Sequence, residues 1–210
     1  MSLGYTDPND IRNGGCRLFH KGLSRELLIE ASKKIIEENG IAAFSMRVLA
    51  EKLGVKTASL YAHVESMEAL FTEVGLSALN DQKAAQLAAV AGKSGDEAVY
   101  ALAEGYRAFA KAHAALYQLI MQMPLGKDGT LRAAAAVTAE PAMQVLRGYP
   151  ISDECLMHWQ QVLRGVMHGF VSQEASGYFS HYPVDREESY RLAIRCVIDG
   201  LHKEAERNER

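Results

Sequence analysis

The stretch over residues 45–64, SMRVLAEKLGVKTASLYAHV, constrains the fold of this chain more than any other. Apolar residues recur at helical spacing through its first half, at Met46, Leu49, Ala50 and Leu53. This spacing predicts a short helix with one apolar face. Ser45 precedes the helix as a candidate N-cap, and Gly54 follows it, where glycine adopts a left-handed turn at least cost. The pattern therefore predicts a helix that ends in a tight turn.

A second short helix is predicted after the turn, with Leu60 and Val64 on its apolar face. The opposite face carries small and hydrogen-bonding side chains, Thr57, Ala58, Ser59, Tyr61, Ala62 and His63. Two short helices joined by a glycine turn are typical of the helix-turn-helix motif, whose second helix enters the major groove of DNA. The same spacing also occurs in all-α proteins that never bind DNA, so the spacing alone leaves both interpretations open.

The residues around the turn resemble a known family. Gly54-Val55, Ser59-Leu60-Tyr61-x-His63 and Ser66-Met67-Glu68-Ala69-Leu70 resemble the DNA-binding domain of the TetR family of bacterial repressors. The resemblance extends over residues 24–71. It implies an all-α fold with a three-helix DNA-binding head, a helical ligand-binding and dimerisation body, and no cofactor. The expected divisions are an N-terminal tail at 1–22, a head at 23–70 and a body at 71–210.

The candidate DNA-binding residues follow from their chemistry and from the resemblance; they are Arg47, Lys56, Thr57, Ser59, Tyr61 and His63. Arginine can reach a phosphate or a guanine edge, and lysine and hydroxyl groups can bind phosphates. The family often has a small hydroxyl residue in place of Lys56, so either Thr57 caps the second helix or its cap is weak. It often has lysine in place of Met67, which removes one phosphate contact, although backbone amides at that helix start can still bind phosphate.

The net charge of −3 is unusual for a DNA-binding protein until the chain is divided. Residues 17–65 carry eight Lys or Arg and six Asp or Glu, which gives +2 there and −5 over the remainder. The excess is small, so DNA affinity must come from charge on one face, repeated in two copies. No signal sequence or apolar run of membrane-spanning length is seen, so no membrane partner is expected. Three dispersed cysteines argue against a disulfide framework and favour a reducing cytoplasm.

The N-terminal tail contains turn signals and little apolar periodicity. Disorder is one interpretation, and a basic arm that reaches DNA through Arg12, Arg17, His20 and Lys21 is another. Beyond the tail, apolar periodicity predicts helices over 24–39, 68–90, 96–113, 114–123, 131–146, 152–179 and 186–206, with Pro141 as a kink or break. The loop at 91–95 lacks the phosphate-binding glycine pattern. The resemblance implies that the last two helices pair with their copies in a homodimer.

No arrangement of catalytic or metal-binding residues is found in the sequence, so neither an enzyme nor a metal site is expected. Aromatic, methionine and histidine side chains in the body could line a cavity for a small, largely apolar effector: Tyr106, Phe109, Tyr117, Met121, Trp159, Met167 and His168. Packing in the core explains most of them equally well. The expected function is a ligand-responsive repressor on operator DNA. The alternatives are a small-molecule carrier or enzyme built on the body, or a module that uses the motif for protein contacts.

Overall fold

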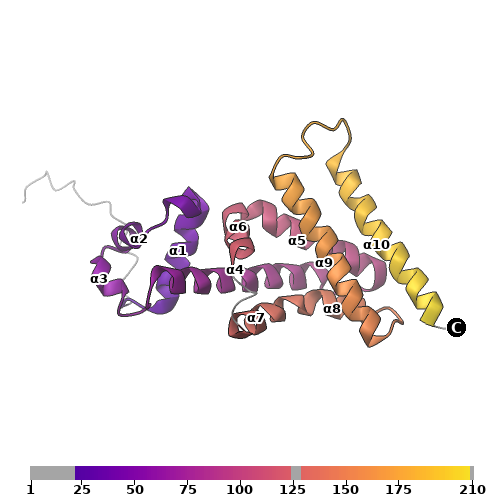
Figure 1. Ribbon diagram of the computed structural model, residues 1–210, viewed down its shortest axis with the longest axis horizontal. Helices are drawn as coiled ribbons and strands as arrows, with labels where there is room; N and C mark the ends of the chain where they lie inside the picture. The colour runs from indigo at the N-terminus through magenta and orange to yellow at the C-terminus, as the bar shows by residue number, and fades with distance from the viewer. Residues whose placement is uncertain (1–21, 124–128, 209–210) are drawn as a thin grey trace, which may run out of the picture.

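The structure, a computed structural model, describes residues 22–123 and 129–208, and within these ranges it is helical with no strand (Figure 1). Most of the predicted tail, with Cys16 and the basic-arm residues, lies outside the described residues. The elements are α1 (Arg25–Asn39), η1 (Ile41–Ala43), α2 (Met46–Leu53), α3 (Thr57–Leu60), α4 (Met67–Val90), α5 (Gly95–Ala112), α6 (Ala114–Gln122), α7 (Gly129–Ala136), η2 (Val137–Ala139), α8 (Glu140–Leu146), α9 (Asp153–Ala175) and α10 (Arg186–Asn208). The all-α prediction is confirmed.

Three serines begin the helices of the head. The Oγ atoms of Ser24, Ser45 and Ser66 accept the backbone N–H of Leu27, Val48 and Ala69 at 3.3, 3.2 and 3.1 Å. Each bond satisfies one of the backbone donors that a helix start leaves free. Gly54 ends α2 in the left-handed region at φ +68°, as its position in the sequence predicts. The turn of the motif is thus set by local chemistry.

Helix α3 is shorter than the sequence pattern suggests, because only Thr57–Leu60 are helical and the chain continues as turns through His63. Lys56 occupies its N-cap position, and no side chain caps the helix. Of the two alternatives for this cap, the weaker cap is the one observed. The second half of the motif is therefore held chiefly by packing, with Leu60 fully buried and Val64 nearly so.

The helix α4 joins the head to the rest of the molecule, running from beneath α1 to the far side of the body (Figure 1). The apolar core of the head continues along it through Leu70, Val74, Ala78 and Leu79. Helix α6 joins the same core with Leu116, Leu119 and Ile120. The head core is therefore shared with the first helices of the body and does not stop at residue 70.

The core of the body is a second apolar cluster, formed by α5, α8, α9 and α10. Helices α9 and α10 lie beside each other at one side of the molecule (Figure 1). Pro141 stands in the first turn of α8, after the short η2, so the predicted break is a new helix start. The prediction of a helix through residue 179 is wrong: α9 ends at Ala175, and Gly177 follows at φ +74°.

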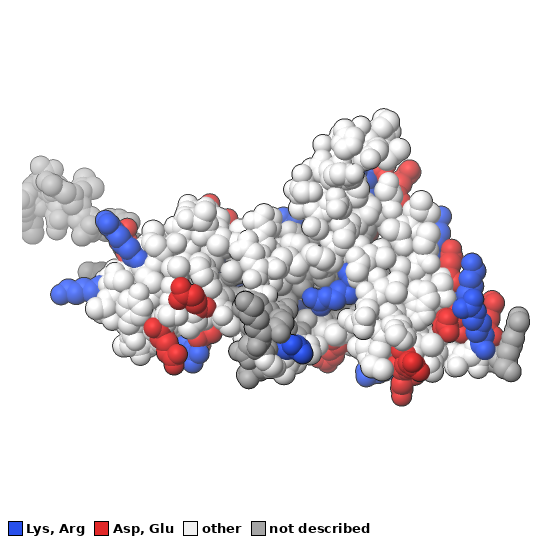
Figure 2. Space-filling view, viewed as in Figure 1, with Lys and Arg blue, Asp and Glu red and all other residues white. Residues whose placement is uncertain are grey.

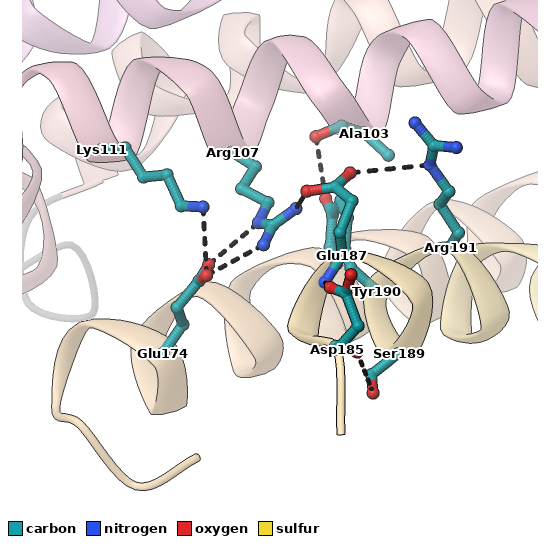
Figure 3. A network of polar contacts seen from close by, with 9 residues as sticks. All are labelled: Ala103, Arg107, Lys111, Glu174, Asp185, Glu187, Ser189, Tyr190 and Arg191. Carbon is teal, nitrogen blue, oxygen red and sulfur yellow. Dashed lines mark hydrogen bonds and ion pairs between the residues drawn. The ribbon is translucent and has the colours of Figure 1, made fainter. Parts of the chain in front are cut away.

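A buried arginine ties the ends of α9 and α10 to α5 (Figure 3). Two hydrogen bonds of 2.9 and 2.8 Å run from Arg107 Nε and Nη2 to the carboxylate of Glu174 at the end of α9. Arg107 Nη1 donates to Glu187, in the first turn of α10, at 2.6 Å. Lys111 reaches Glu174 at 3.0 Å. Because these are charge-assisted bonds to both helices, they set how the α9–α10 pair is oriented on the body.

Candidate DNA interface and ligand centre

The exposed face of α3 and the turn after it is the candidate DNA interface. Its anchors, Leu60 and Val64, are buried, whereas the side chain of Tyr61 is 50% exposed. Ala58, Ser59 and Ala62 are exposed, and Thr57 and His63 are half-buried. The structure thus presents as one surface the small and hydrogen-bonding face expected from the sequence.

The two candidate cations of this surface differ in their contacts. Arg47 pairs with Glu51 one turn along α2, at 3.0 Å, and both side chains are largely exposed. An exposed pair of this kind contributes little stability, so Arg47 can exchange it for a phosphate at small cost. Lys56 is exposed and, among the described residues, has no ion-pair partner. Figure 2 shows Lys and Arg side chains projecting from the end of the head where α2 and α3 lie.

Arg25 is a residue of this surface that the sequence reasoning missed. A polar hollow of about 330 Å³ lies where the end of α3 meets α1 and α4, and Arg25, Tyr61 and His63 line it with Glu73. Arg25 holds Glu73 through two hydrogen bonds, and its guanidinium is exposed. Its place directly after the Ser24 cap was the available signal, because a side chain in the first turn of α1 faces the same end of the head as the motif.

Three of the candidate ligand residues form a hydrogen-bonded chain in the body. The hydroxyls of Tyr106 and Tyr117 are joined at 3.0 Å, and the Tyr117 hydroxyl lies 2.6 Å from Nδ1 of His168. Burial raises the pKa of both tyrosines, so both hydroxyls stay protonated. Burial and the nearby Arg164 lower the pKa of His168, which favours the neutral ring. Met167 is buried in the same cluster.

The remaining candidate ligand residues lie elsewhere. Phe109 belongs to the head cluster and stacks on His113 with ring centroids 4.8 Å apart. Met121 is 39% exposed. Trp159 packs against the body core and over Gly200 of α10. The structure therefore brings together Tyr106, Tyr117, Met167 and His168, and separates the others from them.

Two searches of the described residues found nothing. No group of three or more His, Cys, Asp or Glu side chains in residues 22–123 and 129–208 is arranged to hold a metal ion. No helix in these ranges is long and apolar enough to span a membrane.

A short helix, a left-handed glycine turn and a second helix with an exposed polar face, carried on a larger helical body, define a helix-turn-helix DNA-binding protein. Residues 28–74 match the family described as bacterial regulatory proteins, tetR family, and residues 99–197 match the tetracyclin repressor-like C-terminal domain. The chain belongs to the TetR family of regulators, and it is a DNA-binding transcriptional regulator.

Relatives support this assignment along most of the chain. An uncharacterized HTH-type transcriptional regulator of Mycobacterium tuberculosis, Rv0681, is 32% identical over 78% of this chain and 75% of its own length. The regulator YobS of Bacillus subtilis is 28% identical over 86% and 93%.

Solved structures share the fold. A protein from Rhodococcus is 23% identical with a TM-score of 0.73, covering 88% of this chain and 98% of its own. The regulator ActR of Streptomyces coelicolor, determined with actinorhodin, is 20% identical with a TM-score of 0.66, covering 88% and 99%.

Proposed function

We propose that this protein is a ligand-responsive repressor that binds a pseudo-palindromic operator as a homodimer. The observation that carries the proposal is the exposed face around Tyr61, held over the buried anchors Leu60 and Val64. Small side chains allow close approach to base edges, and hydroxyl and imidazole groups can bond phosphates. In this arrangement the two copies place their second helices in successive major grooves, about 34–36 Å apart or somewhat more.

The DNA contacts that we propose come from α2, α3 and the following turn: Arg47, Lys56, Thr57, Ser59, Tyr61 and His63. Arg47 and Lys56 neutralise phosphates, and Tyr61 and His63 bond to phosphates or base edges. Arg25 adds a further cation at the same end of the head. The head at 23–70 and the body at 71–210 remain the proposed divisions, with α4 crossing between them.

The homodimer that we propose forms through α9 and α10. Both helices carry large apolar side chains that are exposed in the single chain, Met157, Val162 and Leu192, at 55%, 46% and 56%. Burying these side chains against a second copy supplies the hydrophobic gain that association needs. Such a pairing makes a four-helix interface from two α9–α10 pairs.

The body is the proposed site of the effector. ActR, which shares this fold, has been determined with actinorhodin, and this chain carries its own polar centre at Tyr106, Tyr117 and His168. An effector that binds the DNA-free geometry better than the DNA-bound one releases the operator. A hundredfold loss of DNA affinity requires about 2.7 kcal/mol of such coupling. We expect the protein to act in the cytoplasm, and the comparisons favour a regulator over the carrier or enzyme alternative.

Fluorescence anisotropy tests the DNA-binding part of the proposal. The full chain is titrated onto labelled promoter DNA from beside its own gene and onto scrambled DNA, at two salt concentrations. We expect selective binding that weakens steeply with salt, because phosphate contacts release counterions. Equal and weak binding to both DNAs would contradict an operator at that position.

Tyr61→Ala should weaken operator binding by about tenfold or more without changing the melting temperature, because the side chain is half exposed and contributes little to the core. Tyr182→Ala is the matched control, since Tyr182 is 49% exposed on the loop between α9 and α10. Normal binding by Tyr61→Ala would mean that the assigned register of the second helix is wrong.

A further inference from the structure

The hydrogen-bonded chain in the body lies where four helices meet. Tyr106 comes from α5, Tyr117 from α6 and His168 from α9. Gln82 of α4 borders the same hydroxyl as Tyr117, because its amide opposes the rise in the pKa of Tyr106 that burial causes. Tyr106, Tyr117 and Gln82 are 3%, 5% and 4% exposed, whereas His168 is half-buried. The centre therefore deepens from α9 inward to α4.

Arg164 brings an uncompensated positive charge to this centre. It stands one helical turn before His168 on α9, and its charge lowers the pKa of His168 and opposes the raised pKa of both tyrosines. Its side chain is half-buried, and no carboxylate in residues 22–123 or 129–208 pairs with it. Arg107, the other arginine of the body interior, contacts two carboxylates. A shielded cation without a counterion is a favourable place for an anion.

Gln82 provides the second, independent observation. Its Nε2 is buried and, among the described residues, is the one buried side-chain nitrogen or oxygen without a hydrogen-bond partner. A buried donor of this kind costs stability unless an acceptor reaches it. Since Gln82 and Arg164 both border the Tyr106 hydroxyl, the unused donor and the unpaired cation belong to one site.

We propose that the effector of this regulator is an organic anion, a carboxylate or sulfonate on an apolar body, and that Arg164 and Gln82 bind its anionic, hydrogen-bond-accepting group. The inference rests on the proposed function, because it names the class of ligand for the same body site. The neutral His168 and the protonated tyrosines bring no negative charge that would repel the ligand. Met167 and the apolar cluster around it receive the uncharged part. Arg164 and His168, nearer solvent, are the groups that an entering anion meets first.

A matched pair of fluorescent probes tests the charge requirement on the full-length protein without DNA. Anilinonaphthalene sulfonate carries the anionic group, and N-phenylnaphthylamine has the same ring system without the sulfonate. We expect the sulfonate probe to bind the wild-type protein saturably and at least about tenfold more tightly than the neutral probe. Arg164→Gln should remove this preference and leave binding of the neutral probe unchanged.

Two further variants separate the site from general effects of charge and folding. Arg147→Gln removes the same charge from an exposed arginine directly after α8 and should leave both affinities unchanged. Gln82→Leu should weaken sulfonate binding severalfold and raise the melting temperature, because it removes a buried donor that has no partner. Unchanged sulfonate binding in Arg164→Gln, equal losses in Arg164→Gln and Arg147→Gln, equal wild-type affinities for both probes, or no saturable sulfonate binding would each overturn the inference.

The probe assay and the DNA assay fail independently. Probe binding is measured on the protein alone, so an incorrect operator does not affect it. Arg164→Gln should keep wild-type affinity for operator DNA, since Arg164 lies on α9, outside the head. Absence of selective DNA binding by the wild-type protein would refute the proposed function, whereas normal DNA binding with indifferent probe binding would refute only the class of effector.

Discussion

Replacing Arg107 with methionine should destabilise the body strongly, because it leaves a buried carboxylate without its main partner. The side chain of Arg107 is 4% exposed and that of Glu174 is 11% exposed. Methionine keeps much of the volume and the packing on Tyr190, which the guanidinium now covers at 4.7 Å from the ring centroid. The expected loss is therefore electrostatic rather than a cavity effect.

The pKa of Glu174 sets the magnitude. Hydrogen bonds from Arg107, chiefly, and from Lys111 lower this pKa from 4.5 to about 2. A difference of that size corresponds to roughly 3 kcal/mol of folding free energy at neutral pH. Because the pKa is lower in the folded state, this contribution is complete above about pH 4.5 and is lost as the pH falls toward 2. The difference between wild type and variant should shrink in the same window.

Thermal unfolding followed by circular dichroism, at one fixed protein concentration, measures the effect. We expect Arg107→Met to lower the melting temperature at pH 7 by roughly 6–12 °C, which corresponds to about 3 kcal/mol in a chain of this size. At pH 3 the difference should be clearly smaller. Lys111→Met is the control, because Lys111 is 52% exposed and its pair with Glu174 should contribute less than about 1 kcal/mol. A loss no larger than that of the control, or one that is the same at both pH values, would refute the reasoning.

Three further predictions concern the turn, the packing of α10 and the dimer. Gly54→Ala should cost about 1 kcal/mol of unfolding free energy in denaturant titrations, since φ is +68° and no atom crowds the site; a neutral effect would contradict the left-handed turn. Gly200→Ala should cost about 1–3 kcal/mol and shift tryptophan fluorescence, because the new methyl group would lie 2.3 Å from the ring of Trp159. Gly165→Ala, where nothing lies within 4 Å in the single chain, should leave unfolding of the protomer nearly unchanged. Leu192→Glu should shift the sedimentation coefficient toward the monomer with helicity retained, and an unchanged dimer would exclude this part of α10 from the interface.

The helix-turn-helix was predictable because its determinants are local. A serine cap, an apolar face of eight residues and a glycine at the turn lie within one short stretch, and each acts on its immediate neighbours. The end of α9 was predicted less well. Phe179 continues the apolar pattern, but Gly177 turns the chain two residues earlier, and periodicity does not indicate which glycine adopts a positive φ.

The ligand centre was only partly predictable, because it depends on which faces of different helices meet. Aromatic residues at helical spacing pointed to the body core, yet Phe109 packs toward the head and Tyr106, three residues earlier, packs toward α9. Gln82 and Arg164 carry no signal in the sequence, since isolated polar residues on helices are usually solvated. Their importance appears only when burial and the absence of a partner are known.

Helix α6 gives a physical reason why a ligand in the body can act on the head. Tyr117 faces the hydrogen-bonded centre, while Leu116, Leu119 and Ile120 of the same helix are buried in the core of the head. Residue His113, just before α6, also pairs with Glu37 of α1. A packed helix moves as a unit, so a shift of α6 that follows ligand contact with Tyr117 must displace α1 or open the head core. The spacing of the two recognition surfaces in a dimer is then coupled to the ligand through α6 as well as through α4.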